Sequence, residues 1–170
     1  MFIKFLREHR YASLLLSIFR IYLGWMWLQA GWGKIAGGEF DASGFLNGAI
    51  RKASGEHPAV QAWWADFLQG IALPNVDVLN VLVPWGEFLV GIGLITGTLT
   101  SYAVFLGLIM NFAYMFSGTT STNPQMALIG MLILVAGINA GKLGLDKWVI
   151  PFTKQLLFSK RLKKNFPQST

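Results

Sequence analysis

The sequence contains no cysteine, and only two histidines, His9 and His57, occur among its 170 residues. Without cysteine the chain can form no disulfide, iron–sulfur cluster or thiolate metal site. Both histidines lie outside the long apolar segments. We therefore expect neither a haem held by two histidines nor a metal site within this chain.

Charged residues are also scarce: they make up 13% of the chain, whereas 54% of it is hydrophobic. Soluble domains carry about a quarter charged residues, so this composition predicts an integral membrane protein whose main partner is the lipid bilayer. The net charge of +6 gathers near the ends of the chain and forms no stripe, which argues against nucleic acid as a partner. The length predicts a single domain over residues 1–170.

Four apolar segments are each expected to form a transmembrane helix, which gives an all-α, four-helix bundle. They cover about residues 11–36, 76–100, 102–117 and 124–145, and a basic tail follows over residues 146–170. The first is interpreted as a retained span, because it carries Arg20 and shows no small-residue cleavage site. Basic residues gather at both ends of the chain, so we predict a multi-pass cell-membrane protein with cytoplasmic N- and C-termini.

Residues 37–75 form an acidic extracytoplasmic loop, and an amphipathic helix is expected within it. Pro58 suits the first turn of a helix, and apolar side chains recur after it at spacings of three and four residues. These side chains are Val60, Trp63, Trp64, Phe67, Leu68 and Ile71. Two interpretations remain open: the helix lies flat at the headgroup level with its tryptophans as anchors, or it forms a lid over a cavity between the spans.

The candidate functional residues are the polar side chains inside the apolar segments. There is one in each segment: Arg20, Glu87, Asn111 and Asn139. A helical rise of about 1.5 Å per residue places all four in one band at or just below the middle of the bilayer. An ionisable group there needs a partner, so we predict that Arg20 pairs with Glu87 and that the asparagines add hydrogen bonds. Lys34, at the end of the first segment, is interpreted as an interfacial anchor.

This polar layer supports two interpretations. In the first it is a catalytic site, in which Arg20 and Asn111 orient a carbonyl or anionic group and Glu87 handles a proton. A membrane quinone is the expected ligand, and the other residues expected to bind it are Asn139, Trp25 and Tyr114. In the second the layer is structural, in a non-catalytic scaffold or a binder of a lipid-like small molecule. Solute transport is disfavoured because no inverted repeat is evident.

Four stretches along the chain carry a family resemblance. They are the arginine of the first segment with Gly31-Trp32-Gly33-Lys34-Ile35, Glu87 before Leu94-Ile95-Thr96-Gly97, the loop Gly118-Thr119-Thr120-Ser121-Thr122-Asn123-Pro124, and the ending Ala136-Gly137-Ile138-Asn139-Ala140-Gly141. Together they resemble the DoxX/DoxD-like membrane proteins, and the resemblance extends from about Ser13 to Trp148.

The resemblance implies a four-helix membrane protein and, for DoxD-like members, a subunit of thiosulfate:quinone oxidoreductase. That enzyme passes two electrons from thiosulfate, which becomes tetrathionate, to a membrane quinone. A second redox subunit is implied as a partner, with a homo-oligomer as the alternative. The chain shows no recognisable flavin, haem or metal site, so electrons would pass by direct contact between thiosulfate and quinone or through a cofactor of another chain.

Overall fold

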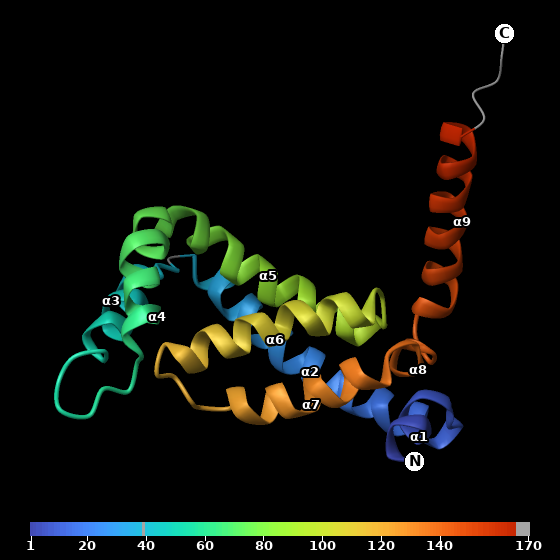
Figure 1. Ribbon diagram of the computed structural model, residues 1–170, viewed down its shortest axis with the longest axis horizontal. Helices are drawn as coiled ribbons and strands as arrows, with labels where there is room; N and C mark the ends of the chain where they lie inside the picture. Colours follow the sequence, from blue (N-terminus) through green and yellow to red (C-terminus); the bar gives the residue numbers. More distant parts are fainter. Residues whose placement is uncertain (39, 166–170) are drawn as a thin grey trace, which may run out of the picture.

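The computed structural model describes the backbone of residues 1–38 and 40–165, and the side chains among them up to residue 155. All regular structure in these residues is helical, which confirms the predicted all-α class (Figure 1). The elements are α1 (Phe2–Glu8), α2 (Arg10–Gly37), α3 (Ser43–Arg51), α4 (Ala62–Phe67), the π-helical turn η1 (Leu68–Ala72), the 3₁₀ turn η2 (Leu73–Asn75), α5 (Val76–Thr96), α6 (Thr100–Phe116), α7 (Asn123–Ala136), α8 (Ile138–Gly141) and α9 (Asp146–Asn165).

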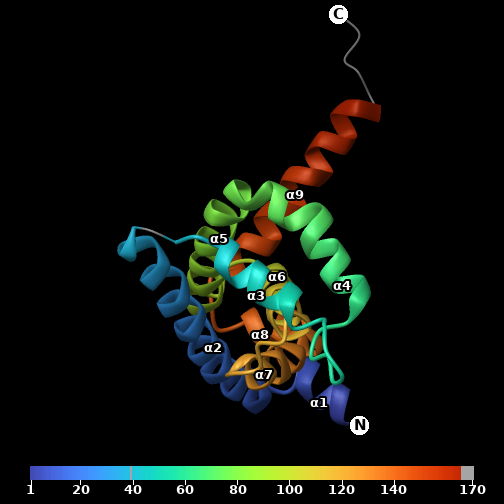
Figure 2. The same ribbon diagram turned by 90° about the vertical axis from the view of Figure 1, so that its left-hand side faces the viewer.

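Four helices, α2, α5, α6 and α7, pack around a common apolar core. The most extensive contacts join α2 to α5 and α6 to α7, and contacts of α5 with α6 and of α2 with α7 complete the arrangement. At one end of these helices lie α3 and α4, whereas α1 and α8 lie at the other end and α9 extends away from the body (Figures 1 and 2). Five of the largest core side chains are Leu16, Leu23, Trp27, Leu94 and Ile133.

Among the residues that the structure describes, two helical runs are long and apolar enough to cross a membrane. They are α2, with 28 residues, and the run Ala62–Thr96, with 35. The other two packed helices are apolar but shorter, with 17 residues in α6 and 14 in α7. α7 ends at Ala136, not near residue 145, because Gly137 adopts a φ of 59° that no helix contains. α7 is therefore about 21 Å long, which is less than the thickness of a bilayer core, about 30 Å. That four helices cross the membrane thus remains a prediction.

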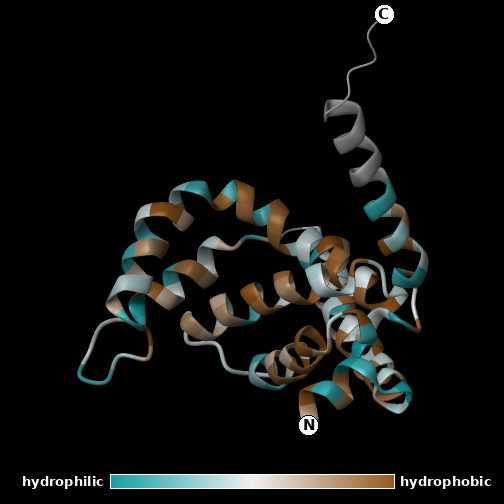
Figure 3. Ribbon diagram, turned by 45° about the vertical axis from the view of Figure 1, so that its right-hand side comes forward, coloured by the Kyte–Doolittle hydropathy of each residue, from teal (hydrophilic) through white to brown (hydrophobic). Residues whose placement is uncertain are grey.

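The outward faces of the four packed helices are strongly apolar. Figure 3 shows hydrophobic residues along the helices and hydrophilic ones mainly at their ends and in the loops. Many large apolar side chains on these faces are each more than a third exposed. They include Ile18, Ile21, Val81, Leu82, Leu89, Phe105, Ile109, Leu128 and Met131. So much exposed apolar surface is rare on a soluble monomer and is expected of helices that face lipid.

Glycines allow the backbones of α2 and α5 to touch. A Cβ atom added at Gly31 would clash with the backbone nitrogen of Phe88 and would lie 2.7 Å from the carbonyl oxygen of Pro84. At Gly91, an added Cβ would lie 2.5 Å from the backbone nitrogen of Leu28. Small residues commonly permit such close approach of membrane helices. These contacts fix the register of α2 against α5.

The amphipathic helix expected in the long loop begins at Ala62 instead of Pro58, and it runs through η1 and η2 directly into α5. The run curves over one end of the packed helices, as Figure 1 shows for α4 and α5. Pro74, which has no N–H to donate, lies in the 3₁₀ turn η2 within this run. There the side-chain amide of Asn75 donates a hydrogen bond of 2.7 Å to the carbonyl of Ile71. The curved run is therefore continuous and holds α4 beside the end of α6.

Candidate functional site

A cavity of about 570 Å³ lies beneath α3 and the α4–η1 run, between them and the adjoining parts of α5 and α6. Its walls are mainly apolar and aromatic: α4 and η1 contribute Trp64, Phe67, Leu68 and Ile71, and α3 contributes Phe45 and Leu46. The indole nitrogen of Trp64 donates a hydrogen bond of 3.0 Å to the hydroxyl of Ser117, which ties α4 to the end of α6. The α4–η1 run therefore lies over this cavity, and of the expected tryptophan pair only Trp63 is mostly exposed.

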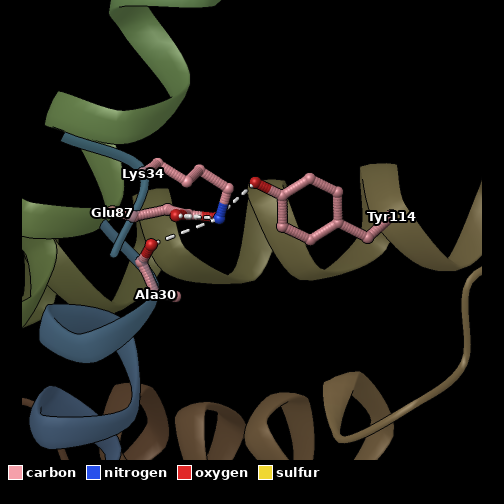
Figure 4. Close-up of polar contacts among 4 residues, drawn as sticks. All are labelled: Ala30, Lys34, Glu87 and Tyr114. Atoms are coloured by element: carbon pink, nitrogen blue, oxygen red, sulfur yellow. Dashed lines mark hydrogen bonds and ion pairs between the residues drawn. The ribbon is translucent and has the colours of Figure 1, made fainter. Parts of the chain in front are cut away.

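Three side chains from three helices meet in the wall of this cavity, and Figure 4 shows their contacts. Glu87 of α5 is only 2% exposed, and its Oε2 lies 2.6 Å from Nζ of Lys34 of α2. The hydroxyl of Tyr114, from α6, donates a hydrogen bond of 2.6 Å to Oε1 of the same carboxylate. Both carboxylate oxygens are thus bonded. We call Lys34, Glu87 and Tyr114 the cavity triad.

Packing around the triad holds each of its members in place. The close α2–α5 contact at Gly31 lies one turn before Lys34, so the ammonium is brought directly to Glu87. Nζ of Lys34 also approaches the carbonyl of Ala30, at 3.4 Å. The ring of Phe45 packs edge-on against the ring of Tyr114, with 6.0 Å between centroids. The triad is therefore a preorganised group at the wall of an apolar cavity.

The predicted pairing of Arg20 with Glu87 is wrong. Arg20 is 1% exposed, and its guanidinium donates hydrogen bonds to the carbonyls of Leu94 and Ile95, the second at 3.1 Å. The reason is register: Gly31 is the α2 residue level with the neighbourhood of Glu87, and Arg20 lies eleven residues before it. That separation is about 16 Å along a helix, more than one arginine side chain can span.

Arg20 belongs instead to a second polar cluster, at the turn between α5 and α6. Asp146 is 3% exposed and accepts hydrogen bonds from the backbone N–H groups of Leu99, at 2.6 Å, and Thr100, at 3.0 Å. These N–H groups lie at the start of α6, where a helix offers them no hydrogen-bond partner. The carbonyls that accept from Arg20 lie at the end of α5. Because its hydrogen-bond partners are backbone groups, this second cluster serves to hold the α5–α6 turn.

The other predicted site residues do not meet at the cavity triad. Asn139 donates hydrogen bonds to the carbonyls of Leu6, at 2.7 Å, and His9, at 3.2 Å, at the end of the molecule where α1 lies. Asn111 is buried on α6, and its Oδ1 has no hydrogen-bond partner among the described residues. Trp25 is 53% exposed on the outer face of α2. The prediction of a single four-residue polar layer is therefore wrong, although the structure does bring Glu87 and Tyr114 together.

Lys34 belongs to the triad, although the sequence predicts that it is an interfacial anchor. A lysine near a helix end commonly reaches for the membrane surface, which is why it is expected to act as an anchor. In the structure its ammonium turns inward to Glu87, and its side chain is only 29% exposed. One signal was available: apart from Arg20, Lys34 is the only basic residue in α2 beyond Arg10, its first residue, and the buried Glu87 requires a cation.

Comparison with protein-family models gives a match to the DoxX family over residues 15–120. Comparisons with curated proteins and with solved structures give no match. The matched stretch runs from α2 to the end of α6, so it contains all three residues of the cavity triad and the α4–η1 run that covers them. It also covers more than half of the chain, and this protein therefore belongs to the DoxX family of membrane proteins.

Proposed function

We propose that this DoxX protein is the membrane subunit of a quinone-linked redox system, similar to thiosulfate:quinone oxidoreductase. The observation that carries the proposal is an apolar cavity of about 570 Å³ with an ion pair in its wall. Pockets of about 300–1,000 Å³ typically combine apolar walls with a few polar groups that orient a ligand. A quinone has the matching form, a flat ring with two carbonyl oxygens and an apolar tail.

Lys34 is the group best suited to hold a quinone carbonyl oxygen. An ammonium carries three donors, and Glu87 and the carbonyl of Ala30 account for two of them. The third is available to an acceptor in the cavity, which Lys34 lines. Glu87 keeps the ammonium oriented from the other side, and Tyr114 in turn fixes the second oxygen of that carboxylate.

A quinone, when bound, accepts two electrons and two protons. The electrons are released when two thiosulfate ions join through a new S–S bond to give tetrathionate, and we assign that half of the reaction to a second redox subunit, with a homo-oligomer as the alternative. Lys34 gives one proton from Nζ to the quinone, and water supplies the second. Glu87, bonded to the same nitrogen, accepts a further proton from water and passes it to Nζ, which restores the ammonium.

The test is quinone binding and reduction by the purified protein with its associated chains. Quenching of tryptophan fluorescence by a quinone analogue reports binding, because Trp64 lines the cavity. Glu87→Gln and Tyr114→Phe are expected to weaken both binding and thiosulfate-dependent reduction. Tyr22→Phe is the matched control, since Tyr22 is 54% exposed on α2, and it should leave both unchanged. Full turnover in folded Glu87→Gln and Tyr114→Phe proteins would refute the assigned roles.

A non-catalytic protein that binds a lipid-like molecule is the second candidate. It is favoured by one observation: both carboxylate oxygens of Glu87 already accept hydrogen bonds, so the triad is also able to serve as a structural link between helices. In that case Lys34→Leu with Glu87→Leu should be tolerated, whereas either change alone should not, because a lone buried charge is costly. Quinone binding without any thiosulfate-dependent reduction would favour this second candidate.

We further propose that α2, α5, α6 and α7 each cross the cell membrane, with the N- and C-termini in the cytoplasm. The chain has no cysteine, so each introduced cysteine is a unique reporter. Ser54→Cys lies in the loop between α3 and α4, and Lys4→Cys lies in α1. A membrane-impermeant maleimide applied to intact cells should label the first and spare the second until the cells are opened. Labelling of both in intact cells would refute the orientation.

A further inference from the structure

The charges at the cavity balance each other. Among the described residues that line it, only Lys34 and Glu87 carry a formal charge, and they form an ion pair of 2.6 Å. The remaining lining side chains are apolar, aromatic or neutral polar groups such as Asn75, Ser117 and Thr119. A ligand therefore meets one ammonium whose charge is already compensated from behind.

We propose that Glu87 makes the cavity selective for neutral ligands that carry a carbonyl, against carboxylates with the same apolar tail. The inference rests on the proposed binding of a quinone in this cavity and adds the reason for its choice of ligand. Glu87 is a specificity-determining residue in this reading, because it neutralises the cation that would otherwise attract any anion. Lys34 then acts as a hydrogen-bond donor and no longer as an anion receptor.

The physical reason is the low polarity of the site. Glu87 is 2% exposed and the cavity walls are largely apolar, so charges at the triad are weakly screened. A ligand carboxylate bonded to Lys34 would bring a second anion close to Glu87, and like charges in one site repel strongly. A neutral carbonyl oxygen accepts a hydrogen bond from the same nitrogen and leaves the ion pair intact.

This selectivity matters in a membrane, where neutral and anionic lipids occur together. Fatty acids have apolar tails like those of quinones and would compete for any cavity whose walls are equally apolar. Discrimination by tail contacts is then small, and a repulsive group at the head position is an effective way to reject the wrong ligand. The ring of Phe40, 5.7 Å from Nζ of Lys34, adds a neutral partner for the ammonium and no further negative charge.

The test compares two probes, a long-chain methyl ketone and the fatty acid of equal chain length, at a pH at which the acid is ionised. Each is titrated into the purified full-length protein and binding is followed by calorimetry. The wild type should bind the ketone more tightly than the acid by about tenfold or more. In Glu87→Gln the uncompensated ammonium should reverse the order, with the acid gaining about tenfold or more.

Two further variants separate charge from local damage. Tyr114→Phe removes the other hydrogen bond to Glu87 but keeps the ion pair, so it should keep the preference of the wild type. Lys34→Gln combined with Glu87→Gln is again neutral and should lose the preference for the acid. If Glu87→Gln keeps the wild-type order, or if Tyr114→Phe also reverses it, the inference is wrong.

The wild type alone provides a second check. Equal affinity for the ionised acid and the ketone overturns the selectivity, whatever the variants do and whether or not they fold. The quinone analogue is titrated in parallel so that two failures are distinguishable. If it binds but the expected preference is absent, only the selectivity fails; if neither it nor the ketone binds, the proposed function fails as well.

Discussion

Replacing Gly31 by alanine should force α2 and α5 apart and loosen the cavity triad. The added Cβ would clash with the backbone nitrogen of Phe88 and would lie 2.7 Å from the carbonyl oxygen of Pro84. Ordinary contacts of a Cβ atom begin at 3.4 Å, so that oxygen is about 0.7 Å too close. Both obstructing atoms belong to the backbone, so no side chain is able to move aside. The two helices must separate.

The cost follows from two opposing terms. Forcing an extra methyl group into a packed contact typically costs about 1–3 kcal/mol. Alanine in a helix interior regains about 0.5–1 kcal/mol relative to glycine. Gly33→Ala isolates the second term, because an added Cβ meets nothing within 4 Å there and the position lies on the same helix. The difference between the two variants, about 1–3 kcal/mol, is therefore the steric term alone.

Thermal unfolding of the purified proteins in detergent measures that difference. Gly31→Ala should unfold at a lower temperature than the wild type, and Gly33→Ala at the same or a slightly higher one. Because the triad lies one turn from Gly31, binding of a quinone analogue should weaken in the first variant and persist in the second. Equal stability of the two variants would refute the contact between backbones on which the register of α2 and α5 depends.

Two further changes test the second polar cluster. Asp146→Asn removes the charged acceptor of the N–H groups of Leu99 and Thr100, so it should lower the free energy of unfolding by about 1–2 kcal/mol, as measured by thermal unfolding. Arg20→Leu removes the donor to two carbonyls of α5 and should cost about 1.5–3 kcal/mol. Quinone affinity should be unchanged in Arg20→Leu. A large loss of affinity in a folded protein would contradict this and would show that Arg20 takes part in quinone binding.

Features set by local composition could be predicted from the sequence. The apolar segments and the amphipathic stretch after Pro58 follow from hydropathy and spacing alone, and they correspond to α2, α4, α5, α6 and α7. The need of Glu87 for a buried partner is also predictable, because a carboxylate inside an apolar segment is costly unless it is paired. The end of α7 could not be predicted as readily, since glycine is tolerated within membrane helices and only its φ of 59° at Gly137 shows the break.

The partner of Glu87 could not be found from depth arithmetic. That arithmetic assumes that the second span begins level with the end of the first, but the helical run begins at Ala62 and arches over the bundle before it reaches Glu87. The register is fixed by tertiary contacts at Gly24, Gly31 and Gly91, and no local pattern distinguishes these glycines from the others in the chain. An error of about four helical turns in register exchanges Lys34 for Arg20 as the partner.

Arg20 and Lys34 differ in their hydrogen-bond partners, and we propose that this difference distinguishes a structural cation from a functional one. Arg20 bonds to main-chain carbonyls that any sequence would present at the end of α5, so its removal acts on folding. Lys34 bonds to a side-chain carboxylate, and both groups face a cavity that the α4–η1 run covers. An ion pair that only links α2 to α5 requires neither a cavity nor an aromatic helix over it. We therefore propose that the cavity beneath the α4–η1 run, with the triad in its wall, holds a ligand, and that Glu87 selects this ligand by compensating the charge of Lys34.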